Sequence, residues 1–477
     1  MRMVSITLSM SLLFSVAIPV YGQSNPENNP GWMTISLDDL NAFENPGKNW
    51  IVAADAWGNY TQKGELEKIK EGKGVVINHP SEKNRTQLTT KQQFGDIEIA
   101  LDFMMAKGSN SGVYLQGKYE VQLLDSWTKP VPTAGDCGGI YQRWDHSRPA
   151  GYKGYEGIAP LQNACRAPGL WQQLVIKFRA PRFNAQGNKI ANARFEEVYL
   201  NGVLVQSQVE VTGPTRSPSL SDKENAQGPL LLQGDHGKVA FRNIRYRPLN
   251  IISVKLPNKA PIIITPNQHP YLLRSFMEFG GKKLTNVISM GDQLGLNYSY
   301  DLKEGSLFQV WRGRFLDATD MWHSRGQGQF AVPLGSIVPF SGAPSIAALS
   351  DKNEPWPDSV TFDELQDEGY ELDKERIPTF SYVIKGTAVK DRIAPDPDQT
   401  GFVRTITIIN PAANLYGRII SAGTIEQLSK ELYRVNGSCY IRLDKRYRPQ
   451  IRQTKEGTEM LVSLADPKIP LTYSIIW

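Results

Sequence analysis

The sequence predicts an all-β protein in which a two-sheet sandwich is followed by a second β-rich domain. Glycine and proline are frequent, at 41 and 31 of 477 residues, and they recur between short segments. Those segments alternate apolar and polar residues, as half-buried strands do. Amphipathic stretches long enough for a helical bundle are hard to find, so an all-helical class is excluded.

The composition bounds the function. Hydrophobic residues make up 40% and charged residues 21% of the chain, which excludes disordered and fibrous classes. Basic residues number 53 and acidic residues 48, a net charge of +5. The two signs are interspersed along the sequence, so a nucleic-acid partner is not expected.

The first residues, MRMVSITLSMSLLFSVAIPVYG, combine Arg2, an apolar stretch and the small residue Gly22. This pattern predicts a cleaved secretory signal peptide over residues 1–22. A membrane anchor is the weaker alternative, because the stretch barely reaches the ~20 residues that a spanning helix needs. We therefore expect a mature chain outside the cytoplasm that has no transmembrane segment.

Two domains are expected after this leader. Residues 31–249 contain short alternating runs such as FGDIEIALDFMM, WQQLVIKFRA and KVAFRNIRY, spaced as in a sandwich. The proline-containing connection LPNKAPIIITPNQHP marks the boundary. Residues 271–477 continue with further strand candidates, including LFQVWRGRFLD and FVRTITII, and predict a β-rich C-terminal domain of unknown function.

The stretch SNSGVYLQGKYEVQLLDSW, residues 109–127, predicts a hairpin. A two-residue loop, Gly117-Lys118, would mix polar and apolar residues on each face. A three-residue loop, Gly117-Lys118-Tyr119, pairs Gln116 with Glu120 and Tyr114 with Gln122. One face then carries only apolar side chains, because side chains alternate along a strand. These are Val113, Leu115, Val121 and Leu123.

The other face of this hairpin collects hydrogen-bonding side chains around a glycine. A polyol such as a sugar suits such a face, although most polar sheet faces are simply solvated. Asp125 and Trp127 follow the second strand, and LLLQGDHGKVAF places Gln233, Asp235 and His236 at a turn where a histidine can transfer protons. The face itself is formed by Asn110, Gly112, Tyr114, Gln116, Glu120 and Gln122.

The cysteines and histidines give no metal motif. The chain has three cysteines, so at least one is unpaired within it, while Cys137 and Cys165 could pair without the sequence settling it. The histidines are dispersed and no Cys-x-x-Cys pattern is present, so no zinc site is predicted.

Four runs carry a resemblance to a known family. FGDIEIALDFMMAKGSNSGVYLQGKYEVQLLDSW, APLQNACRAPGLWQQLVIKFRAPRF, ARFEEVYLNGVLVQSQVEVTGPT and GPLLLQGDHGKVAFRNIRYRPL closely resemble the 3-keto-disaccharide hydrolase family over residues 31–249. The family's NSG, YEVQ-x-LD and LQ-x-DHG motifs fall on Asn110 to Gly112, Tyr119 to Asp125 and Gln233 to Gly237. Many members carry Arg where this chain has Gln116, which leaves any charge-based role at that position open.

The resemblance implies a concanavalin-like jelly roll in an exported, periplasmic or secreted bacterial enzyme that cleaves sugars oxidised at C3. A conventional glycosidase needs two carboxyl groups, whereas the predicted face offers only Glu120. The ketone of a 3-keto sugar acidifies the C2 proton, so one base can start an elimination. Either Glu120 or His236 is the expected base and the other the proton donor.

The remaining polar residues are expected to bind the substrate, with Asn110, Gln122 and Gln233 holding its hydroxyls and the developing enolate. The hypothesis admits a divalent metal ion on Glu120 or His236 and does not require one. The alternative function is a non-catalytic, lectin-like carbohydrate-binding protein, since a fold does not fix a function. The full set of predicted substrate-binding residues is Asn110, Tyr114, Gln116, Gln122, Asp125, Trp127, Gln233 and Asp235.

Overall fold

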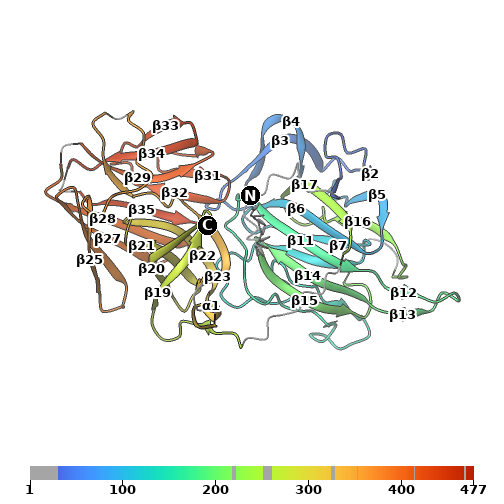
Figure 1. Cartoon of the computed structure of the whole chain (residues 1–477). Coiled ribbons are helices and arrows are strands. Elements are labelled where there is room, and N and C mark those ends of the chain that lie inside the picture. The colour runs from blue at the N-terminus through green and yellow to red at the C-terminus, as the bar shows by residue number, and fades with distance from the viewer. Residues whose placement is uncertain are drawn as a thin grey trace, which may run out of the picture.

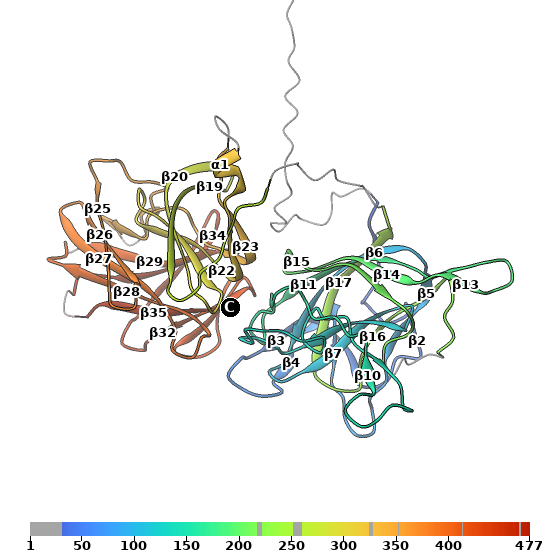
Figure 2. The same ribbon diagram turned by 90° about the horizontal axis from the view of Figure 1, so that it is seen from below.

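The computed structural model describes residues 31–477 except 217–221, 251–259, 324–327, 352, 413 and 467–468. The predicted signal peptide, residues 1–22, lies outside the described residues. Strands dominate, and the prediction of an all-β fold class is confirmed. Figures 1 and 2 show two sets of sheets side by side, one built from the N-terminal half and one from the C-terminal half.

The N-terminal set is a sandwich of two antiparallel sheets. The larger sheet has the order β15 (Val203–Val211), β14 (Ala193–Leu200), β11 (Gln172–Arg179), β6 (Ile97–Met105), β17 (Val239–Pro248), β4 (Leu66–Asn78), β3 (Trp50–Gly58), with β1 (Met33–Thr34) paired to β17. The smaller sheet has the order β2 (Phe43–Glu44), β5 (Leu88–Phe94), β16 (Gly228–Leu232), β7 (Asn110–Leu115), β8 (Tyr119–Leu124). Two short hairpins are added by β9 (Arg143–Trp144) with β10 (Gly154–Tyr155) and by β12 (Arg182–Phe183) with β13 (Lys189–Ala191).

The sandwich forms because each sheet presents one apolar face. Phe103 and Ile176 from the larger sheet and Val121 and Leu232 from the smaller one are completely buried in a single core cluster. Burial of apolar area at roughly 25 cal/mol per Å² is the main favourable term that holds such a core together. The opposite face of the smaller sheet therefore lies outside this core cluster.

The C-terminal set contains three antiparallel sheets and one short helix, α1 (Thr319–His323). The first sheet has the order β18 (Ile263–Ile264), β22 (Ser306–Asp317), β21 (Leu296–Asp301), β20 (Lys282–Gly291), β19 (Tyr271–Phe279), with β23 (Val332–Pro339) paired to β22. The second has the order β24 (Ile346–Ala348), β29 (Leu415–Ala422), β34 (Gly457–Ser463), β33 (Gln450–Thr454). The third has the order β25 (Leu365–Leu372), β26 (Pro378–Ile384), β27 (Thr387–Pro395), β28 (Gly401–Ile409), β35 (Leu471–Ile476), β32 (Cys439–Leu443), β31 (Leu432–Val435), β30 (Ile425–Gln427).

The two sets of sheets pack against each other through a buried cluster of aromatic and aliphatic side chains. Tyr60 and Leu170 from the N-terminal set pack there against Tyr440 and Ile476 from the C-terminal set. Tyr440 donates a 2.8 Å hydrogen bond from its hydroxyl to the carbonyl of Pro168. These contacts hold one half of the chain against the other.

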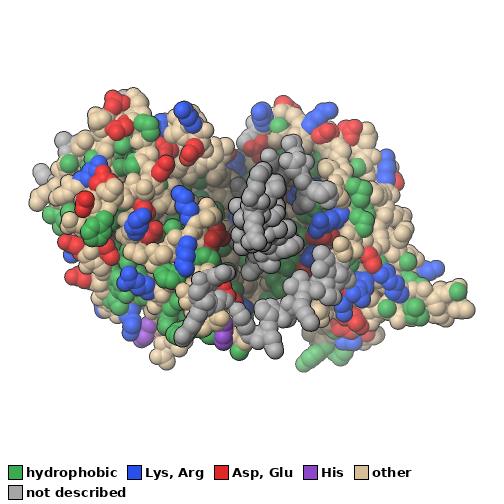
Figure 3. Space-filling view, in the orientation of Figure 1, with side chains coloured by type: hydrophobic (Ala, Val, Ile, Leu, Met, Phe, Trp, Pro, Cys, Tyr) green, Lys and Arg blue, Asp and Glu red, His purple; other side chains and the backbone are tan. Residues whose placement is uncertain are grey.

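The surface carries both charge signs. Figure 3 shows basic and acidic side chains interspersed over both halves on the face in view. This agrees with the small net charge of +5. Among the residues that the structure describes, no helix is long and apolar enough to span a membrane.

Candidate active site

The hairpin of β7 and β8 has its turn one residue earlier than predicted. The ladder pairs Leu115 with Tyr119 and Tyr114 with Glu120, so the three-residue loop is Gln116 to Lys118. Gln116 and Gly117 have φ angles of 55° and 64°, and the Lys118 amide closes the turn on the Leu115 carbonyl at 3.0 Å. The predicted pairing of Gln116 with Glu120 was wrong.

Tyr119 explains this shift. Its ring is completely buried against Phe178, 5.4 Å between ring centroids, and its hydroxyl donates a 2.6 Å hydrogen bond to Glu224. A loop position would have left this ring out of the core. The register moves by two residues, which keeps each side chain on its predicted face because strand side chains repeat every two residues. The apolar face is therefore confirmed: Val113, Leu115, Val121 and Leu123 are at most 1% exposed.

Glu120 and Tyr114 lie opposite each other on the polar face. Glu120 is 2% exposed, and its carboxyl accepts a hydrogen bond from the Tyr114 hydroxyl. Burial, with a smaller contribution from the charge of Asp235, raises the pKa of Glu120 to about 8, although the Tyr114 hydrogen bond opposes the rise. Burial also raises the pKa of Tyr114. At pH 7 both groups therefore carry their protons.

Gly112 makes room for this carboxyl. A Cβ atom at Gly112 would lie 2.3 Å from Oε1 of Glu120, a distance that no side chain permits. The Glu120 carboxyl therefore rests over the Gly112 backbone, where the absent side chain lets it lie. This fixes the carboxyl position on the sheet.

The turn between β16 and β17 brings Asp235 near Glu120, and His236 is hydrogen-bonded to Asp235. Nδ1 of His236 lies 2.7 Å from Oδ1 of Asp235 and 3.2 Å from the Gln233 side-chain amide. A carboxylate oxygen only accepts hydrogen bonds, so we assign the Nδ1 proton to the contact with Asp235, the shorter of the two, which leaves Nε2 as the ring nitrogen that can accept a proton. The His236 side chain is 52% exposed, so its ring is accessible to solvent.

Two buried asparagines hold that turn, and sequence reasoning missed them. Asn78 donates hydrogen bonds to the carbonyls of Gly234 and Gly237 at 3.1 and 2.9 Å. Asn49 donates to Asn78 at 2.7 Å. Both are at most 1% exposed. The signal available for Asn78 was an amide at the end of the apolar run VVIN, because a buried amide needs hydrogen-bond partners.

The hairpin and the turn are joined directly. The backbone amide of Gln233 donates a hydrogen bond to the Gly112 carbonyl at 2.9 Å. The Ser111 hydroxyl donates one to the backbone carbonyl of Gln233, also at 2.9 Å. Gln122 donates from its side chain to Asn110 at 2.6 Å. The structure thus brings together seven of the ten predicted site residues: Asn110, Tyr114, Glu120, Gln122, Gln233, Asp235 and His236.

Three predicted site residues make contacts outside this group. The Gln116 side chain donates to the carbonyl of Ala226 at 3.2 Å. Asp125 accepts a 2.7 Å hydrogen bond from the Gly108 amide, just before β7. Trp127 donates to the Trp477 carbonyl at 2.7 Å in the contact between the two halves.

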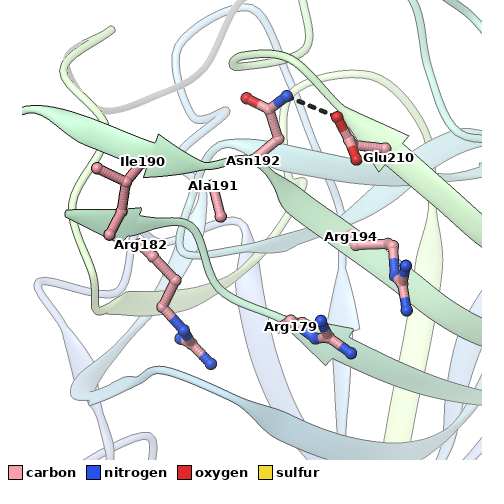
Figure 4. Close-up of a pocket in the computed structure, with 7 residues that line it drawn as sticks. All are labelled: Arg179, Arg182, Ile190, Ala191, Asn192, Arg194 and Glu210. Atoms are coloured by element: carbon pink, nitrogen blue, oxygen red, sulfur yellow. Dashed lines mark hydrogen bonds between the residues drawn. The ribbon is translucent and has the colours of Figure 1, made fainter.

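A separate hollow of about 480 Å³ lies beside the β12–β13 hairpin (Figure 4). Three arginines line it, and each is paired with a carboxylate. Arg179 and Arg194 reach Glu196 at 2.7 and 2.6 Å, and Arg182 reaches Asp96 at 2.5 Å. The hollow contains none of the predicted site residues. In the described part of the chain, no three His, Cys, Asp or Glu side chains cluster as metal ligands would.

Residues 39–247 match the family model described as a 3-keto-alpha-glucoside-1,2-lyase-like domain. The predicted family resemblance is confirmed for this part of the chain. No curated protein matches the chain.

Several solved structures resemble this one in part. A candidate glycosyl hydrolase from Parabacteroides distasonis is 27% identical over 45% of this chain and 84% of its own, with a TM-score of 0.32. A second candidate glycosyl hydrolase from the same organism is 22% identical over 46% of this chain and 99% of its own, with a TM-score of 0.28. The receptor-binding domain of a botulinum neurotoxin mosaic serotype C/D is 10% identical over 94% and 96% of the two chains, with a TM-score of 0.24.

Proposed function

We propose that the N-terminal domain cleaves the glycosidic bond of 3-keto sugars, such as 3-keto-disaccharides or 3-keto-glucosides, by elimination followed by hydration. His236 is the base and Glu120 is the proton donor. The observation that supports this proposal is a carboxyl whose pKa is raised to about 8, in part by the charge of Asp235, while the same Asp235 engages Nδ1 of His236 at 2.7 Å. At pH 7 the Glu120 carboxyl therefore holds a proton that it can donate.

The base acts first. Nε2 of His236 removes the proton from C2 of the sugar, which the C3 ketone has made acidic. The electron pair forms an enolate between C2 and C3, with its charge on the ketone oxygen. Asp235 stabilises the imidazolium that results and holds its orientation, as a carboxylate does for a histidine base. The side-chain amides of Gln122 and Gln233 are the donors available for the enolate oxygen.

The donor completes the cleavage. The enolate electron pair re-forms the carbon–oxygen double bond at C3, creates a double bond between C1 and C2, and expels the C1 substituent. Glu120 protonates the leaving oxygen, which a carboxyl with a pKa of about 8 can do at pH 7. Water then adds across C1 and C2, so the net reaction is hydrolysis. The Tyr114 hydroxyl, hydrogen-bonded to the same carboxyl, fixes the donor in place.

A conventional glycosidase pairing fits these residues less well. It requires a second carboxyl group as nucleophile or as base for water. Asp235 is the carboxyl whose charge raises the pKa of Glu120, and its Oδ1 is already engaged by the His236 ring at 2.7 Å. Its position is that of a group that orients the histidine.

The kinetics of two variants on two leaving groups test these roles. We expect Glu120→Gln to slow turnover of a 3-keto-glucoside with an alkyl leaving group by at least ~100-fold. On 4-nitrophenyl 3-keto-glucoside the loss of turnover in Glu120→Gln should shrink to a few-fold, because 4-nitrophenolate can leave without being protonated. His236→Gln should slow both substrates similarly, and Glu82→Gln, at an exposed glutamate, is the control.

Two results would contradict the assignment. Turnover of the alkyl glucoside by Glu120→Gln within a few-fold of the wild type would remove Glu120 from the mechanism. Binding of the keto sugar by the wild type without any turnover would instead assign the lectin-like function.

We also propose that the protein is exported by a bacterium to the periplasm or beyond, with residues 1–22 removed. The support is the charged, apolar and small-residue pattern of that leader. The mass of the protein recovered from the periplasm measures this directly. A mature chain that begins at Gln23 is expected, and an intact Met1 in the recovered protein would contradict the proposal.

A further inference from the structure

Two thiols face each other in the core of the N-terminal domain. Cys137 is completely buried and Cys165 is 2% exposed, and both belong to the cluster between the two sheets. The Cys137 and Cys165 side chains are hydrogen-bonded to each other. Both also contact the Leu124 carbonyl, which lies 4.0 Å from Sγ of Cys165. The two sulfur atoms therefore share one small volume.

The backbones of the two cysteines are tied to the same serine. The Cys137 amide donates to the Ser126 hydroxyl at 3.2 Å. The Asn163 side chain donates to the Ser126 carbonyl at 2.7 Å and accepts from the Cys165 amide at 2.9 Å. This chain of hydrogen bonds fixes both residues side by side, so that joining them needs a local adjustment of side chains within a fixed frame.

The segment between the cysteines borders the candidate active site. Gly138 donates from its amide to the Gln122 carbonyl at 2.8 Å, and the Tyr141 amide donates to the Glu120 carbonyl at 3.2 Å. At its far end, the Gln162 side chain donates to the Leu334 carbonyl at 2.9 Å in the C-terminal half. A disulfide between residues 137 and 165 would therefore restrain the segment that contacts both β8 and the Leu334 carbonyl of the C-terminal half.

We propose that Cys137 and Cys165 form a disulfide when the chain folds in an oxidising compartment. A small disulfide such as oxidised glutathione is the oxidant. One cysteine thiolate attacks it and releases one glutathione thiolate. The second cysteine then displaces the bound glutathione, so that two cysteines are oxidised and two glutathione thiols are produced.

The link has to form during folding. Oxidants do not reach thiols this deeply buried in the native protein, and the hydrogen bond from Cys165, together with burial, raises the pKa of Cys137 well above its usual range. The third cysteine, Cys439, is also buried, 1% exposed, on β32 of the C-terminal half. It lies in a different apolar cluster from the other two, so it is the thiol that remains.

Counting thiols in the unfolded protein tests the link. The full chain is refolded from denaturant with oxidised glutathione, then unfolded in guanidinium and alkylated. We expect one alkylated cysteine, Cys439, and a tryptic mass 2 Da below that of the two reduced peptides. With reductant present throughout, three cysteines should be alkylated. Three alkylated cysteines after oxidative refolding, or a linked peptide that contains Cys439, would overturn the proposal.

Single variants provide the matched comparison. Cys137→Ser should leave two alkylated cysteines after oxidative refolding and lower the melting temperature by roughly 5–10 °C relative to the oxidised wild type. Cys439→Ser removes a thiol that is equally buried, and it should keep the linked peptide. The oxidised and reduced wild type should therefore melt at different temperatures. Melting temperatures within 1 °C of each other would show that no disulfide restrains the 137–165 segment.

Discussion

The hydroxyl of Tyr114 is hydrogen-bonded to the carboxyl of Glu120, directly across the β7–β8 ladder. This contact lowers the pKa of Glu120, whereas burial and Asp235 raise it. The protonation of the donor is thus set by two neighbours that act in opposite directions. Their removal should have opposite consequences.

The pH dependence of turnover measures this opposition. In the wild type we expect activity on a 3-keto-glucoside to fall at high pH as Glu120 loses its proton, near its pKa of about 8. Tyr114→Phe removes the group that lowers this pKa, so the fall should move to higher pH. Asp235→Asn removes a group that raises it, so the fall should move to lower pH. Shifts in the same direction for both variants would contradict the arrangement.

Stability should depend on pH through the same carboxyl. The usual pKa of glutamate is 4.5, and in the folded protein that of Glu120 is about 8. The protonated Glu120 carboxyl contributes its full share to the stability of the folded protein below pH 4.5. This contribution is lost as the pH rises to about 8. Relative to Glu120→Gln, the wild type should lose roughly 3–5 kcal/mol between pH 5 and pH 9. Denaturant unfolding of both proteins at the two pH values measures it, and a difference independent of pH would refute the buried, protonated state.

Gly112 should be required for the position of the donor. Gly112→Ala places a Cβ 2.3 Å from Oε1 of Glu120, so the carboxyl must move. We expect at least a ~10-fold loss of turnover with the sandwich retained, because the displaced atom ends a flexible side chain. Gly95→Ala is the control, since its nearest neighbour would be 3.4 Å away. Equal activity of the two variants would show that Glu120 needs no fixed position.

Trp127 should contribute to stability and leave catalysis nearly unchanged. Its indole donates to the Trp477 carbonyl at 2.7 Å and packs edge-on to Tyr60, 5.6 Å between centroids. Trp127→Ala should cost roughly 2–4 kcal/mol of stability while kcat/KM stays within a few-fold. Calorimetry and kinetics measure the two effects, and Trp322→Ala, at a tryptophan that is 65% exposed, is the control. A large loss of kcat/KM with unchanged stability would return Trp127 to the substrate site.

Local alternation was sufficient to predict the strands and the face that carries Glu120. The parity of Val113, Leu115, Val121 and Leu123 is a property of the strand backbone, so it survives an error of two residues in register. The exact turn was not predictable by the same means. It depends on the burial of Tyr119 against Phe178 on β11, a contact made by residues far apart in the sequence.

Long-range contacts account for the other differences. Trp127 was predicted to bind the substrate, and in the structure its indole donates a hydrogen bond to the carbonyl of Trp477, 350 positions away. Asn49 and Asn78 position the His236 turn through hydrogen bonds that span more than 150 residues in the case of Gly234. A single sequence shows the chemical type of such residues but not which distant backbone group they meet.

The central claim is that cleavage begins with removal of the C2 proton by His236. The most direct measurement is turnover of a 3-keto-glucoside and the corresponding unoxidised glucoside in deuterated water, followed by NMR of the products. The account predicts that the keto sugar is cleaved and its product gains deuterium at C2, while the unoxidised glucoside binds weakly and stays intact. Cleavage of the unoxidised glucoside at a comparable rate, or a keto product without deuterium at C2, would contradict it.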